Sequence, residues 1–406
     1  MKDKKIYMVG IGGIGMSALA QLYAHEGAIV TGSDKSESPT THLLREKGVE
    51  PYIGHSAAQV PEDTQLLVYS DAVPENNPER ARAVALGIPQ QSYFEALGEV
   101  AKHKRTIAVA GTNGKTTTTA MLGRLLIEAG LDPTVVVGSI VSEWGSNFRA
   151  GKSDLFVVEA CEYRNHFLNF APELLIITNI EWDHTDYFKT PAELEAAFNE
   201  ARRRAKGVIE KEQYKNENIP DLLVPGEFNK ENARAAKAAA KRVSPNTPES
   251  VWDASLASYK GTWRRFEQKG TLPGGALLYD DYAHHPTAIA KTIEAARQKF
   301  PGKKIVLFFH PHLYSRTRDL FDAFALALAS ADETYILPVY AAREPHDPSV
   351  SHEALAAAVV AKGGTARAVD GYEETAGLLQ RLSGDTIAFT MGAGDVYKAG
   401  EAALKK

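Results

Sequence analysis

The sequence predicts an α/β protein of three domains, each with a mostly parallel sheet covered by helices. Apolar, β-branched stretches alternate with helix-like stretches along nearly the whole chain, and such alternation is typical of parallel sheets. A chain of 406 residues is also too long for one ordinary core. We therefore expect domains at residues 1–103, 104–260 and 261–406.

The first predicted domain reads as three strand and helix pairs. The strands are KIYMVG, AIVTGSD and QLLVYSD, and the helices between and after them are SALAQLYAHEG, TTHLLREKG and PERARAVALG. The hydrophilic stretch GEVAKHKR then precedes the next apolar strand. It predicts the junction with the second domain.

The second and third domains repeat this alternation. The second has the strands TIAVAG, DLFVVEA and ELLIITNI, the alanine-rich helix NKENARAAKAAAKR and the loop VSPNTPES. The third opens with a predicted hairpin in RRFEQKGTLPGGALLYDDY and continues from the strand KKIVLFF to the strand DTIAFTMG. The third domain is therefore expected to resemble the first in fold class.

Composition argues against two classes of function. The 46 basic and 51 acidic residues are mixed along the chain, which gives a net charge of -5 without a basic block, so nucleic-acid binding is not expected. No uninterrupted apolar run reaches the roughly 18 residues of a membrane helix, and glycines interrupt the apolar N-terminal stretch.

The single cysteine, Cys161, allows no internal disulfide, which favours a reducing compartment. We expect a cytoplasmic protein.

A shortened phosphate-binding loop lies between the first strand and the first helix of the second domain. In VAGTNGKTTTT, Gly111 and Gly114 let the backbone N–H groups of Thr112, Asn113 and their neighbours turn inward, and the following helix adds positive potential. Lys115 supplies a charge for the β- and γ-phosphates, Thr116 a hydroxyl for Mg²⁺, and Thr117 continues the loop into the helix. This pattern predicts an ATP site.

Polar groups follow two later strands of this domain. Glu159 ends DLFVVE, whereas Asn179, Asp183 and His184 follow LLIIT. Open α/β sheets bind ligands at the carboxyl ends of their strands, so these groups are candidates for holding magnesium against ATP. A carboxylate and an imidazole close to the threonine hydroxyl could complete a magnesium shell around ATP, although magnesium generally prefers oxygen ligands.

A second glycine loop opens the chain. MVGIGGIGMS matches GxGxxG through Gly10, Gly12 and Gly15, and Asp34 follows about twenty residues later. This pattern fits an NAD-dependent dehydrogenase. A UDP-sugar offers the same pyrophosphate and ribose, however, and two separate phosphate loops in one chain favour ATP together with a second nucleotide-linked substrate.

The third domain carries four histidines and a candidate carboxylate-binding arginine. His284, His285, His310 and His312 match no zinc-site spacing. Arg316, just after the strand KIVLFF, could grip a carboxylate with its planar fork, or could pair on the surface with Asp319 at i+3.

Together these motifs resemble the Mur ligases of peptidoglycan synthesis. The similar stretches are GIGGIGMSALA, GTNGKTTT, TNIEWDH, GEFNKENA, RRFE, DDYAHHPTAI, PHLYSRTRD and GAGD, in the family's order over nearly the whole chain. The resemblance implies an N-terminal Rossmann-like UDP-binding domain, a central P-loop ATPase domain and a C-terminal Rossmann-like amino-acid-binding domain. It also implies an ATP-dependent ligase, most like the members that join L-alanine to UDP-N-acetylmuramate through an acyl phosphate, acting as a monomer or homodimer.

The resemblance also implies a role for individual residues. Lys115, Glu159, His184 and Arg265 are the implied catalytic residues, and Thr116, Glu159 and His184 hold Mg²⁺. Asn229 and Asn232 lie by adenine, Arg265 meets phosphate and Asp281 meets the ribose. Gly12, Gly13, Asp34 and Ser70 touch the UDP-sugar, and Tyr282, His284 and Arg316 form the amino-acid pocket.

The sequence departs from the family pattern in four places. Phe228 stands where the family usually has histidine, Leu313 where many members have arginine, and Cys161 where aspartate is frequent. The run from His184 to Gly226 is several tens of residues shorter than usual, so we expect a trimmed central sheet. Three alternatives to the L-alanine ligase stay open: a ligase that attaches a preformed tripeptide to the same UDP-sugar, the dehydrogenase, and a non-catalytic UDP-sugar binder.

Overall fold

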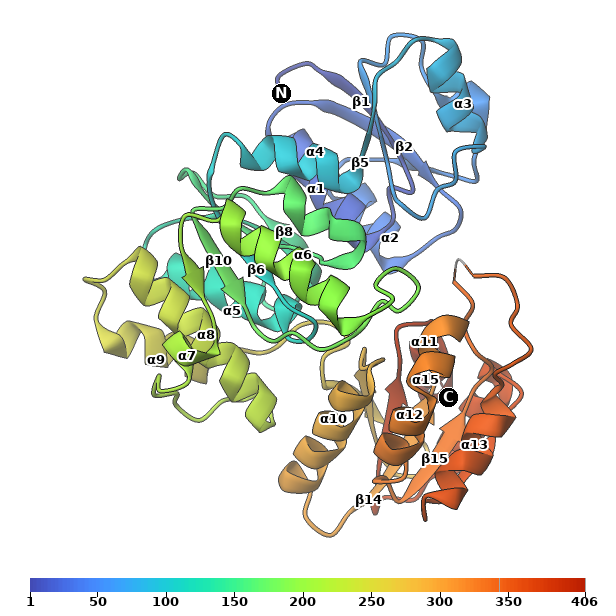
Figure 1. The fold of residues 1–406 in the computed structure, drawn as a ribbon. Helices are drawn as coiled ribbons and strands as arrows, with labels where there is room; N and C mark the ends of the chain where they lie inside the picture. The colour runs from blue at the N-terminus through green and yellow to red at the C-terminus, as the bar shows by residue number, and fades with distance from the viewer. Residues whose placement is uncertain (343, 406) are drawn as a thin grey trace. The chain divides into compact units, whose positions relative to one another are not determined.

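The structure, a computed structural model, describes residues 1–342 and 344–405 (Figure 1). It contains three sheets of five, six and six strands whose neighbours are mostly parallel, and helices connect the strands. The predicted three-part α/β architecture is therefore confirmed. Within the described residues, every helix is too short or too polar to span a bilayer.

The first sheet is entirely parallel and has the order β3-β2-β1-β4-β5. Because the order reverses at β1, the loops that follow β1 and β4 flank one crevice, where such sheets bind ligands. The strands are β1 (Lys5–Val9), β2 (Ile29–Asp34), β3 (Pro51–Ile53), β4 (Leu66–Tyr69) and β5 (Gln90–Ser92). The helices are α1 (Ile14–His25), α2 (Pro39–Glu46), the 3-10 turn η1 (Ala57–Gln59), α3 (Pro78–Ala85) and α4 (Tyr93–Ala101).

The central sheet has the order β11-β10-β6-β9-β7-β8, with one antiparallel pair, β7 and β8. Its strands are β6 (Arg105–Ala110), β7 (Thr134–Val141), β8 (Ser146–Arg149), β9 (Leu155–Glu159), β10 (Leu174–Ile177) and β11 (Val208–Ile209). Helix α5 (Lys115–Glu128) follows β6, as predicted. Neither strand of the β7–β8 hairpin was predicted. The polar second strand, SNFR, lacks the apolar pattern of a buried strand, whereas the first, TVVVGSIV, has that pattern and was missed.

The run between β10 and the alanine-rich helix contains one helix of 14 residues and two short elements, of two and four residues. The elements that follow β9 are η2 (Tyr163–Asn169), α6 (Pro191–Arg204), α7 (Lys211–Tyr214), α8 (Glu227–Val243) and α9 (Glu249–Ala257). Edge strand β11 has two residues, and Tyr214 of α7 anchors this region by donating from Oη to the carbonyl oxygen of Thr178 over 2.7 Å.

A buried polar network joins helix α1 of the first sheet to strand β8 of the second. Gln21 donates from Nε2 to Asn147 Oδ1 over 3.1 Å and accepts from Ser146 Oγ over 3.0 Å, and Asn147 Nδ2 donates to Ser17 Oγ over 3.0 Å. All four side chains are buried. The two sheets accordingly belong to one compact unit, formed by Met1–Ile180, Glu195–Pro220 and Asn232–Ser258.

The third sheet forms the second compact unit and has the order β12-β13-β17-β14-β15-β16. The predicted hairpin is confirmed, because β12 (Glu267–Thr271) pairs antiparallel with β13 (Leu277–Asp281). The other strands are β14 (Lys304–Phe309), β15 (Glu333–Ile336), β16 (Ala366–Ala368) and β17 (Thr386–Met391). The helices are α10 (Pro286–Lys299), α11 (Tyr314–Asp319), α12 (Phe321–Leu328), α13 (His352–Ala361), α14 (Tyr372–Gln380) and α15 (Tyr397–Leu404).

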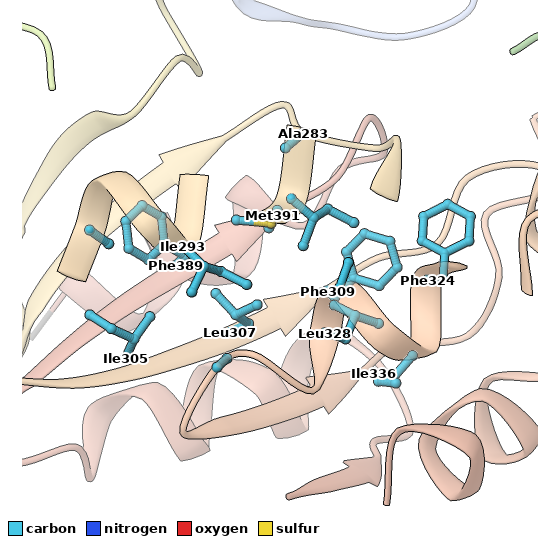
Figure 2. Close-up of a cluster of buried hydrophobic side chains, with 14 of the residues drawn as sticks. Ala283, Ile293, Ile305, Leu307, Phe309, Phe324, Leu328, Ile336, Phe389 and Met391 are labelled. Carbon is cyan, nitrogen blue, oxygen red and sulfur yellow. The ribbon is translucent and has the colours of Figure 1, made fainter. Parts of the chain in front are cut away.

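Helices cover both faces of this third sheet. Ile305, Leu307 and Phe309 of β14 point to one face, where Figure 2 shows Phe309 and Leu307 among Ile293, Phe324 and Leu328. The alternate residues, Val306 and Phe308, join a second cluster with residues of α14 and α15. This period of two on a strand buried on both sides is the pattern that the apolar run KIVLFF predicts.

Two segments inside the range 104–260 pack with the third sheet. Residues Glu181–Leu194 and Asp221–Glu231 belong to the second unit, together with Tyr259 and the residues after it. His184 and Asn229 therefore lie in the second unit, although both precede residue 260.

Candidate active site

The glycine loop after β1 is held by backbone and side-chain acceptors of β2. Gly10 N and Ile11 N donate to the carbonyl oxygen of Ser33 over 2.8 and 2.9 Å, and Gly12 N donates to Asp34 Oδ2 over 2.9 Å. A Cβ atom on Gly12 would lie 2.7 Å from the Thr41 methyl carbon and 2.9 Å from Asp34 Oδ2. Only glycine fits there without a shift of these neighbours.

A cavity of about 280 Å³ opens beside this loop. Its lining contains residues of both sheets of the first unit, namely Gly13, Ile14, Gly15, Met16, Ser70, Asp71, Tyr93, Phe94, Val136, Val137, Gly138, Glu159 and Cys161. The cavity brings Gly13 and Ser70, predicted for the UDP-sugar, to the same space as Glu159, predicted for magnesium. It lies at the carboxyl ends of β1, β4 and β9, as the sheet rule predicts.

The loop after β6 is anchored by the end of the neighbouring strand β10. Thr112 N donates to the carbonyl oxygen of Asn179 over 3.0 Å, while the Asn179 amide accepts from Asn113 N over 3.0 Å and donates to the Asn113 carbonyl over 2.8 Å. Asn179, a magnesium candidate in the sequence, therefore supports the loop.

Two glycines let this loop run close to its neighbours. Gly111 has φ of +131° and Gly114 has φ of +86°, both in the region that favours glycine. A Cβ atom would lie 2.2 Å from Thr178 Oγ1 at Gly111 and 2.2 Å from Asn232 Oδ1 at Gly114. Asn232, predicted to lie by adenine, thus lies directly against the loop, and Thr117 is buried in the first turn of α5.

Lys115 forms a buried ion pair with Glu162, which the sequence analysis missed. Lys115 Nζ lies 2.9 Å from Glu162 Oε2, and the Glu162 side chain is 1% exposed. Burial disfavours the lysine charge, but the Glu162 carboxylate outweighs it and raises the pKa of Lys115. The ammonium group is therefore charged and held at the loop. An acid three residues after Glu159, in EACE, was the available signal.

Thr116 and Glu159 supply adjacent oxygens at the start of α5. Thr116 Oγ1 donates to Glu159 Oε1 over 3.0 Å, and Gly138 N donates to Glu159 Oε2 over 2.8 Å. Two neighbouring ligands of an octahedral Mg²⁺ at 2.0 to 2.1 Å are about 3 Å apart, so this oxygen pair fits that ion. Among the described residues, no three or more His, Cys, Asp or Glu side chains gather as a metal cluster. The four histidines of the third domain accordingly form no such site.

Cys161 lies beside the same pair, on the cavity wall. Burial, reinforced by the Glu162 carboxylate, raises the pKa of the thiol to about 12. The thiol is therefore neutral.

The second unit holds the remaining predicted residues. Both oxygens of Asp281 accept backbone N–H groups, Oδ2 from Phe266 over 2.8 Å and Oδ1 from Ala283 over 2.7 Å. Burial raises the pKa of Asp281 to about 6. Arg265 lies with its guanidinium carbon 5.1 Å from the centre of the Tyr282 ring. Asp281 therefore organises the hairpin end that carries Arg265.

Asn229 and Phe228 start helix α8 in this unit. Asn229 Nδ2 donates to the Pro225 carbonyl over 2.7 Å. The Phe228 ring packs against the core cluster of Figure 2 and fills the space beside Gly226. It is therefore an apolar anchor for this segment.

His184 and Arg316 meet at one carboxylate, that of Asp183. His184 N donates to Asp183 Oδ1 over 2.7 Å, and Arg316 Nε donates to the same oxygen over 2.7 Å. His184 has φ of 52°, an uncommon backbone conformation for a residue other than glycine. Arg316 thus pairs with Asp183 and not with Asp319, which pairs with Arg318 over 2.9 Å.

Tyr282 and His284 lie next to this pair. His284 Nδ1 is 2.9 Å from the Tyr282 carbonyl oxygen, and the two rings meet edge to face. Burial, assisted by the Arg316 charge, lowers the pKa of His284 well below 6.5, so its ring is neutral. Leu313, buried and with φ of 72°, precedes α11 and turns the chain toward Arg316.

The predicted residues thus divide between the two units. The first holds Gly12, Gly13, Asp34, Ser70, Gly111 to Thr117, Glu159 and Asn232, and the second holds His184, Asn229, Arg265, Asp281, Tyr282, His284 and Arg316. In the first unit Gly13, Ser70 and Glu159 line one cavity. In the second unit the Asp183 carboxylate joins His184 to Arg316.

Comparison with protein families covers most of the chain. The model described as Mur ligase family, catalytic domain matches residues 5–105, that of the Mur ligase middle domain matches residues 109–206, and that of the Mur ligase, glutamate ligase domain matches residues 264–394. The three matches follow the order of the three sheets.

Relatives of similar length are ligases. The chain is 41% identical to a UDP-N-acetylmuramate–L-alanine ligase from Desulfitobacterium hafniense over 445 positions, covering 98% of both chains. It is 36% identical to a protein of the same name from Clostridium kluyveri, covering 100% of this chain and 99% of the relative. Because the first alignment spans 445 positions and this chain has 406 residues, that relative contains residues absent here.

The fold is similar to a crystal structure of a UDP-N-acetylmuramate-alanine ligase from Thermotoga maritima, with a TM-score of 0.85, 28% identity and coverage of 99% of this chain and 98% of that one. A murein peptide ligase from Psychrobacter arcticus shares the fold at a TM-score of 0.71 and 21% identity, covering 99% of each chain. The two phosphate loops, the three sheets and the full-length relatives agree, and the chain belongs to the Mur ligase family.

Proposed function

We propose that this chain is an ATP-dependent ligase that joins L-alanine to the lactyl carboxylate of UDP-N-acetylmuramate. The observation that carries the proposal is the cavity shared by Gly13, Ser70 and Glu159, because it sets the nucleotide-sugar loop beside the ATP loop in one unit. The names of the full-length relatives support the same substrates. Family membership argues against the dehydrogenase.

The reaction has two steps. A lactyl carboxylate oxygen attacks the γ-phosphorus of ATP, the bond to the bridging oxygen breaks, and ADP leaves. The amine nitrogen of L-alanine then attacks the acyl carbon of the resulting acyl phosphate, phosphate leaves with the electron pair of the C–O bond, and the nitrogen loses a proton to give the amide. Both steps develop negative charge on oxygen, which nearby cations stabilise.

The ATP site uses the loop after β6. The backbone of Gly111, Thr112, Asn113 and Gly114 and the start of α5 at Thr117 cradle the phosphates. Lys115, already charged beside Glu162, turns to the β- and γ-phosphates. Asn229 and Asn232 serve the adenine, Arg265 the phosphates and Asp281 the ribose, and Arg265 and His184 join Lys115 and Glu159 as catalytic residues.

Magnesium is the proposed cofactor, with Thr116, Glu159 and His184 as ligands. The Thr116 and Glu159 oxygens have the chemistry and the 3.0 Å separation that suit it. When bound, the ion neutralises charge on the ATP phosphates. Gly138 N holds the second Glu159 oxygen and so fixes the carboxylate.

The other substrates have separate sites. Gly12, Gly13, Asp34 and Ser70 contact the UDP-sugar, and Tyr282, His284 and Arg316 form the amino-acid pocket. We also propose domain boundaries near residues 103 and 260, a cytoplasmic location, a monomer or homodimer, and no nucleic-acid or membrane partner.

Phosphate release tests the function. Purified protein with ATP, magnesium and UDP-N-acetylmuramate should release phosphate only when L-alanine is added, and NAD(H) should not bind. Binding of the UDP-sugar with no release in any mixture would instead identify a non-catalytic binder. Preferred use of L-Ala-γ-D-Glu-diaminopimelate over free alanine would identify a tripeptide ligase.

A further inference from the structure

Asp183 and Arg316 form a buried, two-point ion pair in the second unit. Arg316 Nε donates to Asp183 Oδ1 over 2.7 Å, and Arg316 Nη2 donates to Asp183 Oδ2 over 3.3 Å. Asp183 is 3% exposed and Arg316 is 2% exposed. The carboxylate therefore occupies the side edge of the guanidinium, formed by Nε and Nη2.

The outer edge of the guanidinium, formed by Nη1 and Nη2, is less engaged. An arginine side chain carries five N–H groups. Within the described residues, Nη2 makes one hydrogen bond, to Asp183, and Nη1 makes only long contacts, 3.3 Å to His312 Nδ1 and 3.4 Å to the His312 carbonyl oxygen. A ligand carboxylate that displaces these long contacts with His312 would give this edge two parallel hydrogen bonds.

Backbone geometry fixes Asp183 itself. Its Oδ1 also accepts the N–H of His184 over 2.7 Å, and His184 adopts its left-handed conformation at this point. One carboxylate oxygen thus ties the Arg316 side chain to the backbone of the next residue. The orientation of the Arg316 guanidinium is therefore fixed by Asp183 before any ligand binds.

The histidine beside this pair leaves Arg316 as the local cation. His284 nearby is neutral, because burial and the Arg316 charge lower its pKa. Arg316 is accordingly the cation that a ligand carboxylate meets at this place.

We propose that Asp183 is a positioning residue for amino-acid recognition: it holds the side edge of Arg316 so that the outer edge grips the carboxylate of L-alanine. This inference rests on the proposed function and deepens it.

The test compares two acceptors that differ in the recognised group. L-Alanine carries the carboxylate, and L-alaninamide carries an uncharged amide in its place. In Asp183→Asn, the KM for L-alanine should rise about tenfold or more, because a charge-assisted fork is no longer held. The KM for L-alaninamide should change by less than about threefold, as should those for ATP and UDP-N-acetylmuramate. Equal increases for both acceptors would overturn the proposal, since a merely structural defect does not distinguish them.

Two further variants keep the result interpretable. Asp319→Asn removes a carboxylate from the exposed pair with Arg318 on the same helix, and it should leave both KM values unchanged. If Asp183→Asn does not fold, Arg316→Lys retains the charge opposite Asp183 but lacks the fork. It should show the same loss for L-alanine alone, and unchanged selectivity between the acceptors would overturn the proposal.

Failure of the proposed function gives a different result. A wild-type protein that releases no phosphate with either acceptor would reject the ligase itself. Wild-type turnover with an unchanged acceptor ratio in the variants would reject only the role of Asp183.

Discussion

The two glycine loops of the first unit share a strand–loop–helix arrangement and differ in charge. Each follows a parallel strand, opens a helix and is held by a side chain at the end of a neighbouring strand: Asp34 for the first loop and Asn179 for the second. Only the second loop adds an ammonium group, Lys115, and an oxygen pair from Thr116 and Glu159. The difference shows that the same strand–loop–helix arrangement can carry different charges, and we expect those charges to decide which phosphate chemistry each loop serves.

The largest expected effect is at Lys115. Lys115→Ala should lower kcat/KM for ATP at least about tenfold, because each charged hydrogen bond lost costs roughly 1.5 to 3 kcal/mol. Steady-state kinetics with varied ATP measure it. Because Lys115→Ala also removes the cation beside the buried Glu162 carboxylate, Lys115→Met in a Glu162→Gln background is the matched control for stability. Full activity in Lys115→Ala would show that the charge of the second loop is not needed for turnover.

Gly12 tests the first loop by sterics alone. Gly12→Ala should raise the KM for UDP-N-acetylmuramate by about tenfold and leave the KM for ATP unchanged, because the new methyl group would press on Thr41 and Asp34. Gly54→Ala, a left-handed glycine with open space around the Cβ position, controls for backbone strain without crowding. A rise in the KM for ATP instead would contradict the assignment of the UDP-sugar to the first loop and of ATP to the second.

Glu159 tests the oxygen pair of the second loop. Glu159→Gln should raise the magnesium concentration for half-maximal rate by about fivefold, because a neutral amide oxygen binds a hard cation less well than a carboxylate. Magnesium titrations at saturating substrates measure the change. Wild-type magnesium dependence would remove Glu159 from the metal site.

The smallest effect should be at Asp34. Asp34→Asn should change the KM for the UDP-sugar by about threefold or less, because the amide oxygen can still accept the Gly12 N–H. Asp34→Ala removes that acceptor and should have the larger effect. If both variants lose the same affinity, the negative charge and not the hydrogen bond is what matters.

The sequence predicted the three sheets, the helix after each glycine loop and the hairpin of the third sheet, because hydrophobic period and glycine position determine these locally. It did not predict the β7–β8 hairpin, whose second strand has a polar sequence. The site was only partly predictable for a similar reason. Glu162 and Asp183 gain their importance from Lys115 and Arg316, which are distant in sequence and become partners only after the sheets assemble. The roles of the named site residues stay predictions.

The buried network of Gln21, Ser146, Asn147 and Ser17 has a consequence for inhibition. It fastens helix α1 to strand β8, so we expect the walls of the 280 Å³ cavity to keep their spacing when a ligand binds. A bivalent compound with one anionic group at Gly13 and another at Lys115 would find its second site at a high effective concentration once the first is filled. A stiff linker would then gain more affinity than a flexible one, because the protein already maintains the span that the linker has to match.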